Sequence, residues 1–225
     1  MRVSAVICAK NEEKTIAEVV KGAKKFCDEV IVVDGASRDR TKILAEKAGA
    51  KVIPDEGKGK GEALKKGIRE ASGEIVVFLD GDGSHDPEEI PRILKPIKQG
   101  LADHVAGSRF LGTSDELSGS FERTLRRIGT HIINFLISKR FGIKITDSQN
   151  GFRAVKKETL IKLNLQEKIT TIEQEMVIKT LKKGYKLVEV PSHEYSRKYG
   201  KSKISLLRDG WKYIVSLIYY LYLDP

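Results

Sequence analysis

Cysteines, histidines and long apolar runs are scarce in this sequence, and each scarcity excludes a class of protein. The chain has 225 residues but only two cysteines, Cys8 and Cys27. They provide neither a disulfide framework nor a metal-binding spacing, so a reducing compartment is favoured. The four histidines form no local ligand cluster, and the N-terminal stretch becomes charged too soon for a signal peptide. We therefore expect a globular, cytoplasmic protein.

Charge is abundant and unbalanced. Charged residues make up 32% of the chain, and the formal net charge is +10. This excess favours anionic partners, such as nucleotides, phosphorylated substrates, phospholipids or nucleic acids. A nucleic-acid-binding module would interleave aromatic residues with its basic patches. Only Tyr195 and Tyr199 fit that pattern, so no nucleic-acid partner is expected.

Short apolar runs alternate with helical patterns along the first half. This alternation predicts βαβ units and a mostly parallel central sheet flanked by helices. In the second half, residues 123–140 predict an amphipathic helix, and a later strand is expected to close at Pro191. The predicted strands of the first half are Val3–Cys8, Val30–Val33, Lys51–Ile53, Glu74–Leu79 and His104–Ala106.

Polar segments follow three of these strands, where ligands bind in parallel sheets. Asp80 and Asp82 end the fourth strand; in extended chain they point the same way, and Gly81 leaves room for a ligand. Such carboxylates suit Mg²⁺ or Mn²⁺ shared with substrate phosphates. A solvated turn is the alternative, but acidic endings on the neighbouring strands favour a metal site. His85 and Asp86 are expected in the following turn or helix cap.

Other side chains at this edge suit a nucleotide. Asp34 ends the second strand and can accept hydrogen bonds from a base or ribose. Asn11 is expected to cap the first helix, and Glu12 and Glu13 suit its positive end, with a nucleotide contact as a second role. The segment "EGKGKGEALKKG" lacks the spacing of a P-loop and of G-x-G-x-x-G. It is interpreted as a flexible loop in which Lys60 helps to hold a nucleotide.

Six motifs in order resemble those of the family 2 (GT-A) glycosyltransferases, in the branch of dolichol-phosphate mannosyltransferases and polyprenyl-phosphate glycosyltransferases. The resemblance covers about residues 2–204. It implies a Rossmann-like GT-A fold and an inverting transfer of a hexose from GDP-mannose or a UDP-sugar to a polyprenyl or dolichyl phosphate. The motifs are "KNEE", "VVDGASRDRT", "GKGKGEALKKGIREASGEIVVFLDGDGSHDPEEI", "AGSRF", "DSQNGFRA" and "EVPSHEYSRKYGKSK".

The resemblance also implies roles for individual residues. Asp80 and Asp82 become the metal and diphosphate site, and Asp82 a catalytic residue. Glu175 matches the acidic residue of the acceptor-side helix. The sequence departs from the family at three places. Gly35 leaves the base and sugar open, Ser84 leaves open the metal coordination beyond the two aspartates, and Ala9-Lys10 leaves open the stacking of the base. The implied donor-binding set is Ala9, Asn11, Glu12, Glu13, Asp34, Lys60, Asp80, Gly81 and Asp82; the acceptor-phosphate set is Arg109, Arg153, Arg197, Lys201 and Ser202.

The charge pattern favours a phosphate acceptor. A hydroxyl acceptor needs a general base, for which Asp147 or Glu175 is the fallback. A phosphate monoester, with a second pKa of about 6, needs only cationic groups to bind it. A soluble acceptor, such as a phosphorylated small acid or sugar, is the alternative. A nucleotidyltransferase would show a Gly-rich Arg/Lys loop after the first strand, and "CAKNEE" is not one.

We expect a catalytic domain over residues 1–205, with a nucleotide-sugar half (1–110) and an acceptor half (111–205). Residues 206–225 are expected to form an apolar C-terminal helix. Its strongly apolar stretch, residues 211–223, is too short to span a membrane and contains Trp and Tyr that suit the membrane interface. The basic amphipathic helix 123–140 suits the same surface. Packing on the domain or a homodimer interface is the alternative. A peripheral position on the cytoplasmic membrane face is predicted, with the membrane surface or a small membrane subunit as partner.

Overall fold

The fold is described by a computed structural model that covers residues 1–115, 121–197, 199 and 206–224. Lys201 and Ser202, predicted to bind the acceptor phosphate, lie outside the described residues.

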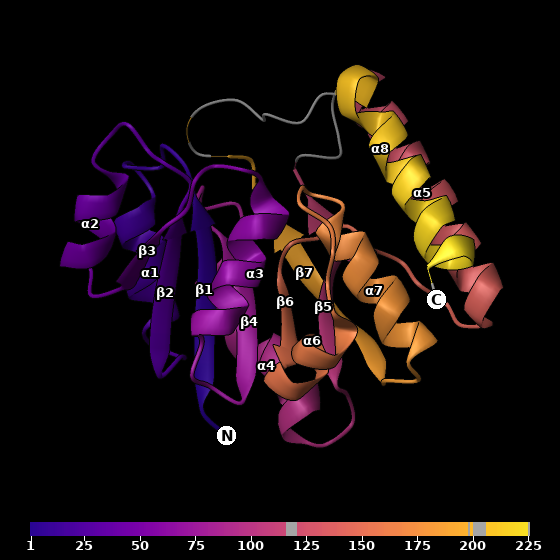
Figure 1. Ribbon diagram of the computed structural model, residues 1–225, viewed down its shortest axis with the longest axis horizontal. Coiled ribbons are helices and arrows are strands. Elements are labelled where there is room, and N and C mark those ends of the chain that lie inside the picture. Colours follow the sequence, from indigo (N-terminus) through magenta and orange to yellow (C-terminus); the bar gives the residue numbers. More distant parts are fainter. Residues whose placement is uncertain (116–120, 198, 200–205, 225) are drawn as a thin grey trace.

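A seven-stranded sheet runs through the molecule in the order β3-β2-β1-β4-β6-β5-β7 (Figure 1). The first four strands are parallel to one another, β6 is antiparallel to both of its neighbours, and β5 is parallel to β7. The predicted mostly parallel sheet of a GT-A fold is therefore confirmed. The strands are β1 (Val3–Ala9), β2 (Glu29–Asp34), β3 (Lys51–Pro54), β4 (Ile75–Asp80), β5 (His104–Ser114), β6 (Arg153–Lys156) and β7 (Leu187–Glu194).

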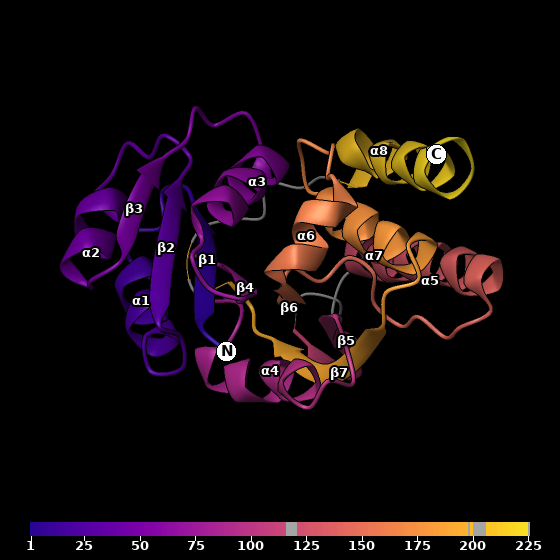
Figure 2. The same cartoon turned by 60° about the horizontal axis from the view of Figure 1, so that its bottom comes forward.

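Helices cover both faces of the sheet (Figure 2). Alternate side chains of β1 divide the core: Ile7 packs with α1, α2 and α4, whereas Val6 packs with α3, α6 and α7. The strands are buried on both faces, which explains their continuous apolar sequences. The helices are α1 (Ile16–Ala23), α2 (Thr41–Lys47), α3 (Lys60–Glu70), α4 (Ile90–Lys98), α5 (Phe121–Phe141), α6 (Lys157–Leu163), α7 (Ile172–Lys182) and α8 (Leu206–Ile218), with a 3₁₀ turn at Pro87–Glu89 and a π-helical turn at Tyr219–Leu223.

The two predicted amphipathic helices, α5 and α8, run side by side at one end of the sheet (Figures 1 and 2). Ile137 of α5, Ile178 of α7 and Leu217 of α8 belong to one buried apolar cluster. Other apolar side chains of both helices remain exposed. In the described part of the chain, no helix combines the length and the apolar character needed to cross a membrane.

Two local expectations are wrong. Asn11 does not cap the first helix, which begins at Ile16; its Oδ1 accepts from Arg38 N (2.8 Å). Pro191 does not end β7, because this edge strand tolerates a missing N–H group and continues to Glu194.

The segment before Pro87 is as predicted. Asp86 caps the 3₁₀ turn by accepting from Glu88 N (2.9 Å), and His85 lies in the connection that precedes it. His85 is buried there, bonds Asn150 Oδ1 through Nε2 (3.1 Å) and stacks on Phe152.

Close packing of α3 on β1 depends on Gly67. A Cβ atom at this position would lie 2.3 Å from Val6 Cγ1, and valine has little rotamer freedom with which to move away. We expect Gly67→Ala to lower the free energy of unfolding by about 1–3 kcal/mol through overpacking, measured by urea denaturation.

Gly129 of α5 provides the matched control, since a Cβ atom there meets nothing within 4 Å. Alanine is the better helix former by about 1 kcal/mol at both positions. Gly129→Ala should therefore be neutral or stabilising. Equal effects of the two substitutions would contradict a steric role for Gly67.

Candidate active site

Asp80 and Asp82, at the end of β4, lie where two cavities meet. The larger cavity has a volume of about 400 Å³ and the smaller about 330 Å³. Because β4 is buried in the middle of the sheet, both carboxylates emerge at its carboxyl edge, as the sequence predicted. The side chains common to both linings are Lys60, Asp80, Asp82, Thr170 and Arg197.

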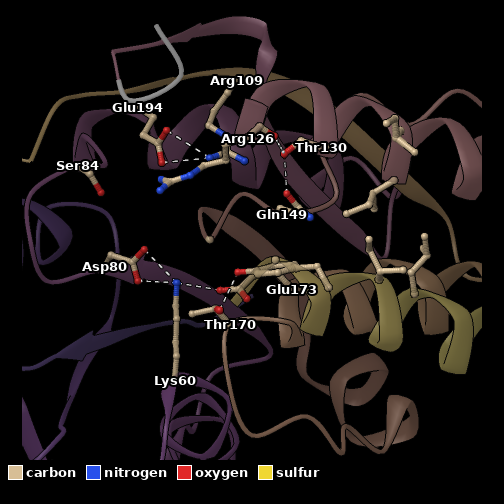
Figure 3. A pocket seen from close by; sticks show the side chains of 18 of the residues that line it. Lys60, Asp80, Ser84, Arg109, Arg126, Thr130, Gln149, Thr170, Glu173 and Glu194 are labelled. Carbon is tan, nitrogen blue, oxygen red and sulfur yellow. Dashed lines mark hydrogen bonds and ion pairs between the residues drawn. The ribbon is translucent and has the colours of Figure 1, made fainter. Parts of the chain in front are cut away.

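Lys60, the first residue of α3, bridges two acidic side chains. Its Nζ lies 2.8 Å from Asp80 Oδ1 and 3.0 Å from Oδ2, and 2.8 Å from Glu173 Oε1 (Figure 3). Burial alone would raise the pKa of Asp80, but Lys60, with His85 and Arg197, holds it below its ordinary value. Burial opposes the charge of Lys60 too, yet the two carboxylates raise its pKa well above the ordinary value. Asp80 and Lys60 are therefore both ionised at neutral pH.

Asp82 is held by a different cation. Arg197, in the segment after β7, places Nη2 2.6 Å from Asp82 Oδ2 and Nη1 3.3 Å from Glu12 Oε1. Ser84 donates to Asp82 Oδ1 from its backbone N (3.0 Å) and its Oγ (2.7 Å). Ser84 therefore orients Asp82, at the position where the family often has glutamine. Gly81 between the two carboxylates is required by close packing, since a Cβ there would lie 2.9 Å from Ala9 Cβ.

The carboxylate oxygens at this junction are suitable ligands for a hard divalent cation. Two carboxylates project into one space, and each is neutralised by a side-chain cation in the ligand-free protein. Within residues 1–115, 121–197, 199 and 206–224, no group of three or more His, Cys, Asp or Glu side chains could hold a metal. Mg²⁺ or Mn²⁺ would thus use Asp80 and Asp82 and complete its shell with substrate oxygens, as is common for these ions.

The smaller cavity lies over β1 and β2 and contains part of the predicted donor-binding set. Ala9, Glu12, Lys60 and Gly81 line it together with the two aspartates. The other three predicted residues are outside its lining. Asn11 bonds Arg38, and Glu13 pairs with Arg40 (3.2 Å). Asp34 is buried beside the cavity, and its Oδ1 has no hydrogen-bond partner among the described residues.

The larger cavity begins with polar side chains. Arg109 forms a bidentate ion pair with the buried Asp147, with Nε 2.7 Å from Oδ2 and Nη2 2.9 Å from Oδ1. Its Nη1 lies 3.3 Å from both carboxylate oxygens of Glu194. Thr130 of α5 donates to Gln149 Oε1 (2.7 Å) in the same lining, next to Arg126 (Figure 3).

Beyond these groups the cavity becomes apolar. Its walls there come from α5 and α8, so the space passes between the two helices. Figure 3 shows the labelled polar side chains gathered at one end and unlabelled carbon-rich side chains along both helices. The apolar lining residues are Ile132, Ile133 and Leu136 of α5 and Ile214 and Leu217 of α8.

Comparison with known proteins agrees with this geometry. Residues 4–163 match the family model described as "Glycosyl transferase family 2". The chain belongs to this family. It is 35% identical over 204 residues to "Glycosyltransferase AglJ" of Haloferax volcanii, covering 89% of this chain and 65% of that one. It is 31% identical over 203 residues to the "Dolichyl-phosphate hexose transferase" of the same organism (89% and 85%). It is 32% identical over 213 residues to the "Dolichol-phosphate mannosyltransferase" of Pyrococcus furiosus (91% and 59%).

Solved structures share the fold. One is glucosyl-3-phosphoglycerate synthase from Mycobacterium tuberculosis in complex with Mn²⁺, UDP and phosphoglyceric acid. It matches with a TM-score of 0.76 and 24% identity, covering all of this chain and 80% of that one. The same enzyme has also been crystallised with Mg²⁺ and UDP. That enzyme thus binds a divalent ion together with a nucleotide.

Two of the side chains that the family resemblance pointed to are buried away from both cavities. The Arg153 guanidinium donates to the carbonyl oxygens of Asn150 (Nε, 3.0 Å) and Glu173 (Nη1, 3.0 Å) inside the core. Glu175 accepts from the backbone N of Gln166 (2.7 Å) and of Glu167 (2.8 Å). These contacts suit structural roles better than phosphate binding or proton transfer.

Several lining residues were missed by the sequence analysis. Glu173 lies two positions before Glu175 and therefore on the other side of α7, facing the cavity. Arg126 and Thr130 of α5 are four residues apart and therefore lie on the same face of the helix. This spacing, next to the apolar lining residues, was the sequence signal that could have predicted this wall of the larger cavity. The polar residues that line the larger cavity and were not predicted include Glu173, Arg126, Thr130, Gln149, Glu194 and Tyr213.

The Arg109–Asp147 pair should be important for stability. Asp147→Asn leaves a buried arginine with less compensating charge, so we expect the free energy of unfolding to fall by about 3–5 kcal/mol at neutral pH. Burial would raise the pKa of Asp147, but Arg109 holds it below its ordinary value. The stabilisation is therefore complete above about pH 4 and is lost as the pH falls through the lowered pKa.

Urea denaturation of wild type and variant at several pH values measures this difference, which should shrink in acid. Glu46→Gln, on an exposed position of α2, is the control and should change stability by less than about 0.5 kcal/mol. A difference that stays constant across the acid range would contradict the ion-pair explanation.

Proposed function

We propose that this glycosyltransferase transfers a hexose, with inversion, from a nucleotide-diphosphate sugar to a polyprenyl or dolichyl phosphate at a membrane surface. The observation that carries the proposal is one continuous cavity. It starts at Asp80 and Asp82, passes Arg109 and Arg126, and continues between apolar walls of α5 and α8. A phosphate attached to a long hydrocarbon chain matches this order of charge and apolar surface.

The donor nucleotide occupies the smaller cavity in this proposal, with its diphosphate at the junction. Lys60 and Arg197 already lie there and can change from the carboxylates to phosphate oxygens. Asp80 and Asp82 would hold Mg²⁺ or Mn²⁺, which supplies Lewis-acid stabilisation of the leaving diphosphate. Asp34, with its unpartnered Oδ1, is available to the base or ribose.

The acceptor phosphate lies between Arg109, Arg126 and Thr130 in the larger cavity. A phosphate dianion is already a nucleophile, so the chain need supply position and positive charge but no general base. Asp147 is poorly suited as a base, since Arg109 occupies both of its oxygens and its pKa is lowered against the effect of burial. The side chains thus favour a phosphate over a hydroxyl acceptor.

The outer surface of α5 supports peripheral binding at the cytoplasmic face of a membrane. Phe121, Leu125, Ile128, Ile132 and Phe135 are exposed at alternating spacings of four and three residues. Such spacing puts them on one stripe of the helix. Trp211, Tyr219 and Tyr222 of the adjoining C-terminal helical segment are exposed too, and these residue types favour membrane–water interfaces. A small membrane subunit or a second copy of the chain is the alternative occupant.

A donor and acceptor screen tests the activity. GDP-mannose, UDP-glucose and UDP-N-acetylglucosamine are incubated with a short polyprenyl phosphate and Mg²⁺ or Mn²⁺, and glycolipid is detected by mass spectrometry. We expect one donor class to give a polyprenyl-phosphate sugar, because phosphate and hydrocarbon both have binding surfaces. Transfer only to 3-phosphoglycerate or another soluble phosphate, included as parallel acceptors, would contradict the lipid acceptor.

The control for that screen is Asp82→Ala, which removes one of the two proposed metal-binding carboxylates. Loss of a metal ligand should abolish measurable turnover with every donor. Near-normal rates in this variant with metal present would contradict the metal assignment.

Membrane binding is tested by liposome flotation with matched surface substitutions. Phe135 on α5 is 64% exposed and Ile161 on α6 is 65% exposed, so the two differ in location but not in accessibility. Burying a phenylalanine contributes roughly 1.5–3 kcal/mol. We therefore expect Phe135→Glu to weaken binding to anionic vesicles about tenfold or more, and Ile161→Glu to have little effect. Equal binding of both variants would contradict an α5-directed membrane surface.

A further inference from the structure

An acidic side chain at the junction of the two cavities has one carboxylate oxygen without a polar partner among the described residues. Glu173, in the first turn of α7, is 2% exposed and lines the larger cavity. Its Oε1 forms an ion pair with Lys60 Nζ (2.8 Å), which also bonds Asp80 Oδ2. Its Oε2 has neither an ion pair nor a hydrogen bond within the described part of the chain. Figure 3 shows the side chain pointing toward Lys60 and Asp80.

This lack of a partner is unusual for a buried carboxylate. Buried polar atoms are nearly always satisfied, and leaving an acceptor without a donor is unfavourable. Glu175, on the same helix, shows the ordinary solution, since each of its oxygens accepts from a backbone N–H group. The neighbouring Tyr213 hydroxyl does not serve Glu173, because it donates to Thr170 Oγ1 (2.7 Å). Among the described residues no donor reaches Glu173 Oε2, and a ligand in the cavity can supply one.

The chemistry of the surroundings limits what this ligand is. A phosphate group would be repelled by the carboxylate, and the Lys60 ammonium already lies on the side where a cation would bind. A neutral hydroxyl fits, because it can donate a hydrogen bond to a carboxylate oxygen that has no other donor among the described residues. In the proposed reaction the transferred sugar lies between the leaving diphosphate at Asp80 and Asp82 and the acceptor phosphate. Glu173 lines the cavity that joins these two places.

We infer that Glu173 is a specificity-determining residue that accepts a hydrogen bond, through its carboxylate, from a hydroxyl group of the donor hexose. The inference rests on the proposed function and adds the group that recognises the sugar itself. Lys60 holds Glu173 and Asp80 together. The Glu173 carboxylate, which accepts from the sugar hydroxyl, is therefore fixed in position relative to Asp80, which binds the diphosphate. A site built to bond a substrate hydroxyl rejects an analogue that lacks it far more strongly than an apolar pocket does.

Binding measurements separate the sugar from the nucleotide. Calorimetry with Mn²⁺ compares UDP-glucose with UDP, and GDP-mannose with GDP, for wild type and Glu173→Gln. We expect the variant to bind the preferred nucleotide sugar about tenfold to a hundredfold more weakly, as for hydrogen bonds to charged groups. Binding of the nucleoside diphosphate should stay within about twofold, because the sugar is the only part of the donor that Glu173 is proposed to contact and Asp80 still holds Lys60. The exposed Glu46→Gln is the control and should match wild type.

Two results would overturn the inference. One is an equal loss of affinity for nucleotide sugar and nucleoside diphosphate, which would assign Glu173 to holding Lys60 and Asp80 in place. The other is no change for either ligand. If wild type binds neither UDP nor GDP with metal, the proposed function itself fails. If it binds one of them and forms glycolipid, only the role of Glu173 is in question.

Monodeoxy sugar donors provide a second measurement. Its first part uses wild type alone and therefore does not depend on whether the variant folds. Each analogue lacks one hexose hydroxyl, and wild type should show a loss of kcat/KM for one of them well above the loss for the others. In Glu173→Gln this particular loss should largely disappear. Uniform use of all monodeoxy donors by wild type would contradict recognition of a hydroxyl by Glu173.

Discussion

Two ion pairs, Lys60 with Asp80 and Arg197 with Asp82, hold together the parts of the chain that form the site. Each cation contacts a second acid as well, Glu173 and Glu12 respectively. Lys60 therefore joins α3, β4 and α7, and Arg197 joins the segment after β7 to β4 and to the loop after β1. Without these cations, carboxylates would face one another across a poorly hydrated space, where like charges repel strongly. The cavities on either side exist because the charges at their junction are balanced.

The reversal of direction at β6 explains why the site has two different sides. The parallel strands β1 to β4 present their carboxyl ends to the smaller cavity, as in other nucleotide-binding sheets. After β4 the sheet continues with the antiparallel β6 and then with β5 and β7. β5 leads into α5, and β7 leads toward Arg197 and α8. Beyond Lys60, Asp80, Asp82 and Ser84, the larger cavity is therefore lined by β5 and by elements that follow it in the chain.

The sequence predicted what depends on local pattern. A buried strand that ends in Asp80-Gly81-Asp82 must put these carboxylates at the sheet edge, so their position followed from the strand alone. Which polar side chains are buried in the core could not be predicted from a single segment in this way. Arg153 and Glu175 stand in motifs of the family, yet tertiary packing buries both and satisfies them with backbone groups. Glu173 and Arg126 reach the cavity because of helix rotation and of packing against α8, which no single segment encodes. The contacts that bury His85 were not predictable for the same reason, since Asn150 and Phe152 come from a distant part of the chain.

The pair of helices α5 and α8 forms a layer outside the sheet that lines the larger cavity, the proposed acceptor side, but not the smaller one. Such an arrangement allows the choice of acceptor to evolve separately from the binding of the nucleotide. Substitutions in the outer faces and the inner walls of these helices can change the acceptor while the sheet edge that handles the nucleotide remains intact. Descendants of one ancestral fold could in this way acquire lipid or water-borne acceptors by remodelling two helices, without having to reinvent the transfer chemistry.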